Sequence, residues 1–112
     1  MSANRRRGEI AAMLNGEEYR LCLTLGALAE LETAFEADDL GALVERFSNG
    51  RLSASDLVRV IGAGLRGGGA AVTDDDVRAM RCDNGAAGYA WIVSELLAVT
   101  FGAPESGPSV NP

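Results

Sequence analysis

Apolar and polar residues alternate on both sides of an Asn-Gly pair near the start of the chain. Asn15-Gly16 is a strong short-range signal for a tight turn between two strands, because both residues tolerate positive φ. The pattern therefore predicts a β-hairpin over residues 9–24. With a two-residue loop, one face of this hairpin carries the apolar side chains Ile10, Ala12, Leu14, Tyr19, Leu21 and Leu23. A lone hairpin is only marginally stable in water, so we expect helices to cover this face.

The next two segments repeat apolar residues at helical spacing. The first helix is expected over residues 25–36, with Thr24 as its N-cap. The second is expected over residues 39–47, and either Asp38 or Asp39 caps it. Their predicted core-facing residues are Ala27, Leu28, Leu31, Ala34 and Phe35 in the first helix, and Leu40, Leu43, Val44 and Phe47 in the second.

A third helix is expected to open at Ser53, where Asp56 completes a variant of the capping box, and to end at the glycines of residues 67–69. Its predicted apolar stripe is Leu57, Val60, Ile61 and Leu65. Thr73 begins a short fourth helix. The aspartates at 74–76 fall in its first turn, where the helix dipole favours negative charge.

The last apolar segment predicts a helix over residues 86–101. On a helical wheel its core side carries Tyr89, Ile92, Val93, Leu96, Leu97 and Val99. Trp91 points roughly the opposite way, near Ser94 and Ala98. A tryptophan outside the core stripe is a candidate contact for a protein partner, because aromatic residues are enriched in interface cores. The alternative is that this helix is buried on both sides.

Together these elements predict a single α+β domain over residues 9–102, in which an N-terminal β-hairpin packs against a bundle of four to five short helices. Residues 1–8 are expected to be a flexible basic segment, and residues 103–112, rich in Pro, Ser and Gly, to be disordered. No apolar run approaches the ~20 residues of a membrane span, and the pattern of a signal peptide is missing. The expected compartment is the cytoplasm.

Gly62 and Gly64 lie inside the third predicted helix, where a glycine costs about 1 kcal/mol relative to alanine. Two such glycines indicate the close approach of another backbone. Internal packing is the favoured interpretation, and contact with a partner is the other. The glycines of this region do not form a phosphate-binding loop, because the chain has no lysine and the glycines follow a helix instead of a strand.

The residue types exclude most catalytic chemistry. The chain has no histidine, which is the usual general base and a common metal ligand. Cys22 and Cys82 lie far apart with no Cys-x-x-Cys pair, so neither a zinc site nor a disulfide is expected. The aspartates at 74–76 are explained by helix capping. We therefore expect no enzyme activity, no cofactor and no bound metal.

The net charge of −6 makes general binding to nucleic acid unlikely, because neutralising phosphates takes clustered cations. The only basic cluster is the run of arginines at 5–7. We interpret it as a solvated chain end, and a DNA-reading arm is the alternative. All basic residues are arginines, which is typical of a GC-rich bacterial genome.

The ordered succession of segments resembles a known family. The succession RGE, hairpin, LTLGALAELETAF, then GRLSASDLVRVIGAGLRGGG, then a helix closing on LLAVTFG is similar to the small tail protein of gene transfer agents, which are phage-like particles of alphaproteobacteria. Related proteins occur in siphophage-like prophages. The likeness covers roughly residues 5–102, and no motif in it is catalytic.

The family is described under two names, tail tube protein and tail assembly chaperone. A tube ring needs substantial β-structure from each subunit, whereas this sequence has one convincing hairpin and five helical segments. It therefore looks more like a chaperone. The resemblance implies a protein that keeps the tape-measure protein soluble in the host cytoplasm until tube subunits polymerise around it. The alternatives are a structural component retained in the particle tail and a small DNA-binding regulator. The expected partners are the tape-measure protein, the tail tube protein or both, and a homo-oligomer is left open.

Overall fold

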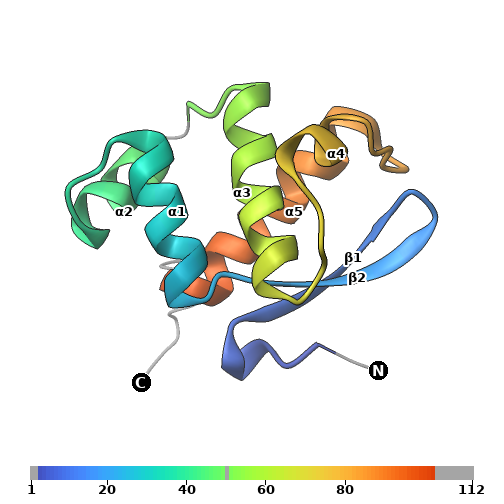
Figure 1. Cartoon of the computed structure of the whole chain (residues 1–112), viewed down its shortest axis with the longest axis horizontal. Helices are drawn as coiled ribbons and strands as arrows, with labels where there is room; N and C mark the ends of the chain where they lie inside the picture. The colour runs from blue at the N-terminus through green and yellow to red at the C-terminus, as the bar shows by residue number, and fades with distance from the viewer. Residues whose placement is uncertain (1–2, 50, 103–112) are drawn as a thin grey trace, which may run out of the picture.

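A computed structural model describes residues 3–49 and 51–102 of the chain. In chain order its elements are η1 (Arg5–Arg7), β1 (Glu9–Leu14), β2 (Glu17–Cys22), α1 (Leu25–Phe35), α2 (Leu40–Ser48), α3 (Ala54–Gly67), α4 (Asp74–Arg78) and α5 (Gly85–Phe101). The predicted fold class is confirmed: an N-terminal antiparallel hairpin packs against a group of short helices (Figure 1). The tail at 103–112, predicted to be disordered, lies outside the described residues.

The hairpin has the predicted register. Ile10 pairs with Leu21 and Ala12 with Tyr19 across the two strands. Ile10, Ala12 and Leu21 are buried and Tyr19 is half-buried. β2 lies against α3 and β1 against α5, so the helices cover the apolar face as the alternating pattern requires.

Helix α3 is the centre of the molecule, and its burial exceeds the single stripe that the sequence predicts. The buried residues run continuously from Val60 to Leu65. This helix contacts β2, α1, α4 and α5, so it is surrounded on nearly all sides. The amphipathic pattern of the sequence does not predict this continuous burial. Small residues such as Ala63, which are neither strongly apolar nor polar, do not show whether their side of the helix faces the core or the solvent.

The glycines at the end of α3 allow β2 to pass close to the helix. A Cβ at Gly67 would lie 2.0 Å from the carbonyl oxygen of Cys22, and a Cβ at Gly68 would lie 2.0 Å from that of Arg20. Such distances are far inside van der Waals contact. The glycine run therefore does more than stop the helix, since it lets the backbone of the hairpin reach the core.

The predicted starts of the first four helices are confirmed by their caps, whereas α5 starts without a side-chain cap. The side chains of Thr24 and Asp39 accept hydrogen bonds from backbone N–H groups of α1 and α2. Ser53 with Asp56 forms a complete capping box at α3. Thr73 does the same for α4 with Asp76, which accounts for the acidic cluster there. The boundaries differ from the predictions by one residue at the end of α1, at both ends of α2 and at the start of α5.

The predicted apolar stripe of α2 is wrong in part. Leu43 is fully buried, but Leu40 is 40% exposed and Val44 is 36% exposed. Phe47 is half-buried and packs edge-on against Phe35, with ring centres 5.3 Å apart. The reason is position, since α2 lies at the edge of the molecule with α1 as its main contact (Figure 1).

Arg46 attaches this peripheral helix to the body of the protein. Its guanidinium donates to the carboxylate of Asp56 at 2.9 Å and to the carbonyl oxygen of Arg51 at 3.2 Å. The same group lies 5.2 Å from the centre of the Phe35 ring. One planar cation thus joins α2 to α1 and to the start of α3.

Replacement of Arg46 by alanine should therefore lower the free energy of unfolding by about 1–2 kcal/mol. Arg46→Lys should recover less than half of this, because an ammonium lacks the planar fork. Arg78→Ala is the matched control, since its ion pair with Asp75 is exposed at the surface. Urea unfolding of the three variants measures the differences, and equal stability of Arg46→Ala and Arg78→Ala would show that Arg46 does not hold α2.

The carboxylate of Asp56 links folding to pH. Burial on its own raises the pKa of Asp56, but hydrogen bonds from the Ser53 backbone and the Arg46 guanidinium outweigh it, so the pKa lies below the ordinary 3.8. A carboxyl with a lowered pKa in the folded state stabilises the fold above its unfolded pKa. This stability is lost as the pH falls through the folded value.

We accordingly expect the wild-type protein to lose stability below about pH 4. Asp56→Asn should be about 1 kcal/mol less stable at neutral pH and should lose less on acidification. Urea unfolding at neutral pH and at about pH 3 tests this. If acid destabilises the variant as much as the wild type, Asp56 is not a source of the pH dependence.

The N-terminal arginines lie in the segment predicted to be flexible, of which the structure describes residues 3–8. They form the 3-10 turn η1, and Arg5 pairs with Glu95 of α5 at 3.0 Å. Arg7 lies 3.8 Å from the carboxylate of Glu9. Carboxylates of the chain itself therefore face two of the three cations. This gives no support to the alternative in which they read DNA.

Candidate functional site

The described part of the chain offers little that could bind a cofactor or a metal. Within residues 3–49 and 51–102, no three His, Cys, Asp or Glu side chains gather where they could hold an ion. Both cysteines are free and half-buried. None of the helices in the same residues has the length and apolar character needed to cross a bilayer. The features that remain are surfaces.

A groove of about 720 Å³ lies between the hairpin and α5. One wall comes from the hairpin, the other from α5, and the turn before α5 closes one end. The lining residues are Ala11, Ala12, Met13, Glu18, Cys82, Asp83, Asn84, Ala87, Gly88, Trp91 and Ile92. Its volume falls within the range of ordinary ligand pockets, and it is open enough to accept side chains from another protein.

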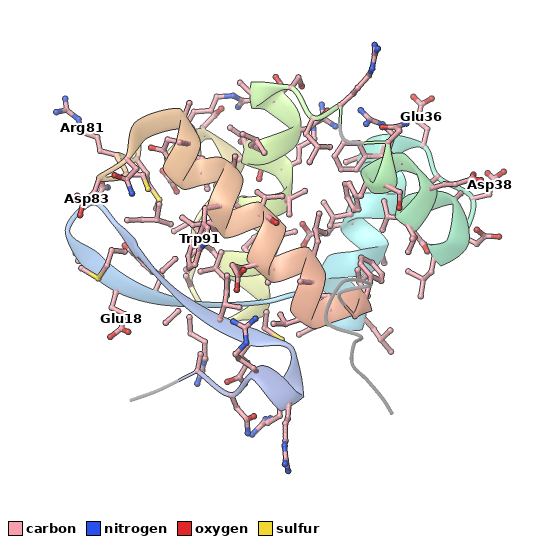
Figure 2. All side chains as sticks on the ribbon, turned by 180° about the vertical axis from the view of Figure 1, so that it is seen from behind. Glu18, Glu36, Asp38, Arg81, Asp83 and Trp91 are labelled. Atoms are coloured by element: carbon pink, nitrogen blue, oxygen red, sulfur yellow. The ribbon has the colours of Figure 1, made fainter. Side chains whose placement is uncertain are left out.

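Trp91 is the most prominent apolar side chain of this groove. It is 57% exposed, while Ile92 and Val93 beside it in α5 are buried. Helix α5 is therefore not buried on both sides, which was the alternative explanation for this tryptophan. Met13 is 50% exposed and belongs to the outward face of β1. Figure 2 shows Trp91 on the exposed face of α5, beside the hairpin.

The width of the groove is fixed by a contact at the tip of the hairpin. The backbone N–H of Asn15 donates to the carbonyl oxygen of Arg81 at 2.8 Å, and the N–H of Arg81 donates back to the Asn15 side chain at 2.9 Å. Asn15 adopts a positive φ of 56°, as its turn requires. The hairpin is thereby held to the segment that precedes α5, and the groove is formed before any partner arrives.

Gly88 and Cys82 are in close contact at the end of the groove nearest the hairpin tip. A Cβ at Gly88 would lie 2.5 Å from Sγ of Cys82, so the glycine lets the segment before α5 pack close to the helix. The sequence gives no signal for this contact. Gly88 is the one buried residue in the first turn and a half of α5.

The groove carries negative charge and its lining includes no cation. Glu18 of β2 and Asp83 of the turn before α5 are both exposed. Among the described residues neither carboxylate takes part in an ion pair. Figure 2 shows Glu18 on the hairpin and Asp83 at the turn before α5. Trp91 lies further along α5 than Asp83.

The other residues singled out from the sequence lie elsewhere. Ser94 is exposed and Ala98 is half-buried, further along the same helix, and neither lines the groove. Gly62 and Gly64 are buried. A Cβ at Gly64 would lie 2.6 Å from a methyl group of Leu96, so this glycine serves internal packing.

Gly62 is explained by an ion pair. A Cβ there would lie 2.2 Å from a carboxylate oxygen of Asp74, which pairs with Arg66 at 3.1 Å. Arg66 also binds Glu30 at 2.7 Å, and these two carboxylates raise the pKa of its guanidinium, with Glu30 contributing most. Contacts within the chain therefore account for both glycines, as the favoured interpretation of the sequence holds. Their close neighbours are side chains, however, and not the second backbone that the sequence analysis expected.

The sequence did not single out Met13, Glu18, Cys82 or Asp83 as site residues. The available signal was Met13, a large apolar residue on the face of the predicted hairpin opposite the core. The rest depend on which segment the hairpin tip contacts, and that contact joins residues far apart in the chain.

A second, smaller groove of about 490 Å³ lies between α3, α4 and α5. Leu57, Val58 and Tyr89 line it, and all three are half-buried. The hydroxyl of Tyr89 donates to the carbonyl oxygen of Met80, and burial raises the pKa of this phenol. This groove has no strongly exposed aromatic side chain, so the Trp91 groove is the better candidate for a partner surface.

Fold and surface together define a small α+β protein with a groove between its hairpin and α5. The family model for "Phage tail tube protein, GTA-gp10" matches residues 7–103, and the chain belongs to this family. It is therefore a protein of phage-like or gene transfer agent tails. Neither the curated proteins nor the solved structures contain a significant match.

Proposed function

We propose that this tail protein is a non-enzymatic assembly chaperone that binds the tape-measure protein before the tube forms around it. In this role it keeps a long helical protein soluble in the host cytoplasm and is released when tube subunits polymerise. The observation that carries the proposal is the preformed Trp91 groove, an exposed apolar surface on a strongly acidic chain.

The distribution of secondary structure favours a chaperone over a tube subunit. The described residues contain one two-stranded sheet, β1 with β2, and the remainder of the core is helical. A subunit that lines a tube through a continuous β-barrel needs more strand than this. A helix-rich surface with an apolar groove is instead suited to an amphipathic helix.

The residue types support a role without catalysis. The chain lacks histidine altogether, and its acidic cluster at the start of α4 is engaged in capping and in the pair between Asp74 and Arg66. The net charge of −6 limits self-association and favours solubility, both useful in a holding protein.

Co-expression with the tape-measure protein of the same particle tests the proposal. We expect the tape-measure protein to move from the insoluble to the soluble fraction and to co-purify with this chain. Co-expression of the chain with the tail tube protein, without the tape-measure protein, serves as the comparison. If the tape-measure protein stays insoluble and the chain co-purifies only with assembled tubes, the chaperone function is wrong.

The second candidate is a structural component that remains in the particle. The name of the family favours it, and so does the hairpin, because a two-stranded sheet leaves strand edges that could pair with a neighbouring subunit. In that case the chain would be found in mature tails in a fixed ratio to the tube protein.

A further inference from the structure

The charged residues that line the Trp91 groove are all acidic, and the proposed function does not by itself require this. Glu18 and Asp83 line the groove from two different elements, and neither is paired with a described cation. Arg20 lies two residues from Glu18 and Arg81 two residues from Asp83; both arginines are exposed and neither lines the groove. Figure 2 shows Arg81 pointing away from Trp91. Any segment that enters the groove therefore meets two carboxylates that make no ion pair within the described residues, beside an apolar surface.

We propose that the groove selects a basic amphipathic segment, in which an apolar side chain is flanked by arginine or lysine. The apolar side chain would lie between Trp91 and Met13, and the flanking cations would reach Glu18 and Asp83. This inference deepens the proposed function and rests on it for the identity of the partner as a tail protein. The chemistry of the groove itself is independent of that identity.

The two apolar residues suit such a segment in different ways. Trp91 presents a large flat surface that loses little conformational freedom on binding, and its ring also attracts a cation placed over its face. Met13 is flexible and adapts to side chains of different shape. Together they provide an apolar contact without strict shape selection, so the choice of partner falls to the carboxylates.

Charge complementarity favours a different protein over a second copy of this chain as the occupant. Each copy carries a net charge of −6, so two copies repel at long range. The best-placed basic cluster of a second copy is the run at 5–7, and there Arg5 and Arg7 already face carboxylates of their own chain. A basic segment of another tail protein meets no such competition.

Trp91 is the only tryptophan of the chain, so its fluorescence reports on this groove alone. The probe is a pair of synthetic peptides of about 20 residues with the same leucine stripe and no tryptophan. Arginines flank the stripe in one peptide and glutamates in the other. We expect only the basic peptide to shift the emission of Trp91 to the blue and to protect it from acrylamide, with affinity falling as salt rises.

Charge variants then assign the effect to the two carboxylates. The double variant Glu18→Lys with Asp83→Lys should weaken binding of the basic peptide by at least about tenfold. The neutral pair Glu18→Gln with Asp83→Asn should have a smaller effect. Glu45→Lys in α2 is the matched control, since Glu45 is also exposed but does not line the groove, and it should change the affinity less than twofold (about 0.4 kcal/mol at most).

The inference is overturned if the basic peptide leaves Trp91 unchanged, if the acidic peptide binds equally well, or if charge reversal has no more effect than Glu45→Lys. Its failure can be told apart from failure of the proposed function. Soluble co-expression of the tape-measure protein without any sensitivity to the two carboxylates would contradict the inference alone. A specific response to the basic peptide without rescue of the tape-measure protein would contradict the chaperone function alone.

Discussion

Replacement of Trp91 by alanine should weaken binding of the tape-measure protein by at least about 30-fold and leave the chain folded. The side chain is 57% exposed, so truncation removes little of the monomer's own packing. In a complex the rest of its surface would be covered, and burial of a tryptophan at the centre of an interface commonly contributes about 2 kcal/mol or more. The affinity is measured by titrating the tape-measure protein with each variant. Thermal unfolding of each variant alone shows whether it is folded.

Leu25→Ala provides the matched control for this prediction. Leu25 is 80% exposed at the start of α1 and does not line the Trp91 groove, so it tests whether any exposed apolar side chain matters. We expect it to bind as the wild type does. A large fall in the melting temperature of Trp91→Ala would instead identify the tryptophan as a core residue. Equal losses of affinity in both variants would show that the groove is not the binding site.

Gly68→Ala should be the most damaging conservative substitution for the fold. The added methyl group would lie 2.0 Å from the carbonyl oxygen of Arg20, and this neighbour is backbone that cannot rotate away. Gly68 has an ordinary φ of −83°, so the expected loss comes from steric contact and not from backbone strain. We expect the free energy of unfolding to fall by about 3 kcal/mol, which lowers the melting temperature by more than about 10 °C.

Gly26→Ala in the first turn of α1 is the corresponding control. A methyl group there meets only the Thr24 hydroxyl, at 3.8 Å, so it should leave stability unchanged or raise it by up to about 1 kcal/mol. Differential scanning calorimetry of both variants makes the comparison. Equal melting temperatures would mean that β2 does not pass against the end of α3 as the structure has it.

Local signals allowed much of the fold to be predicted. The Asn15-Gly16 turn fixes the pairing of the two strands, and with it the face that each side chain occupies. Ser53 with Asp56 and Thr73 with Asp76 mark helix starts through contacts three residues apart. Such features depend on neighbours in sequence, so a single sequence contains the information they need.

Features that depend on packing between distant segments were predicted less well. The stripe of α2 was assigned to the core, although Leu40 and Val44 are exposed, because amphipathicity does not tell how much of a helix the core will cover. The continuous burial of residues 60–65 in α3 follows from its central position. The contacts of Gly67 and Gly68 depend on where β2 crosses, and nothing local specifies that crossing.

The candidate site shows the same division. The wheel placed Trp91 away from the core side of α5, and the side chain is indeed exposed. Its neighbours in the groove come from the hairpin and from the turn before α5, which the contact between Asn15 and Arg81 brings together. Residues so far apart in the chain cannot be grouped without the tertiary structure.

Quantitative mass spectrometry of mature particles tests the proposed chaperone role most directly. Purified tails and the assembling lysate of the same culture would be compared for the ratio of this chain to the tail tube protein. If the chain is a chaperone, we expect it to be abundant in the lysate, bound to the tape-measure protein, and nearly absent from finished tails. Retention in mature tails at a fixed ratio to the tube protein would contradict it and would identify the chain as a structural tail component.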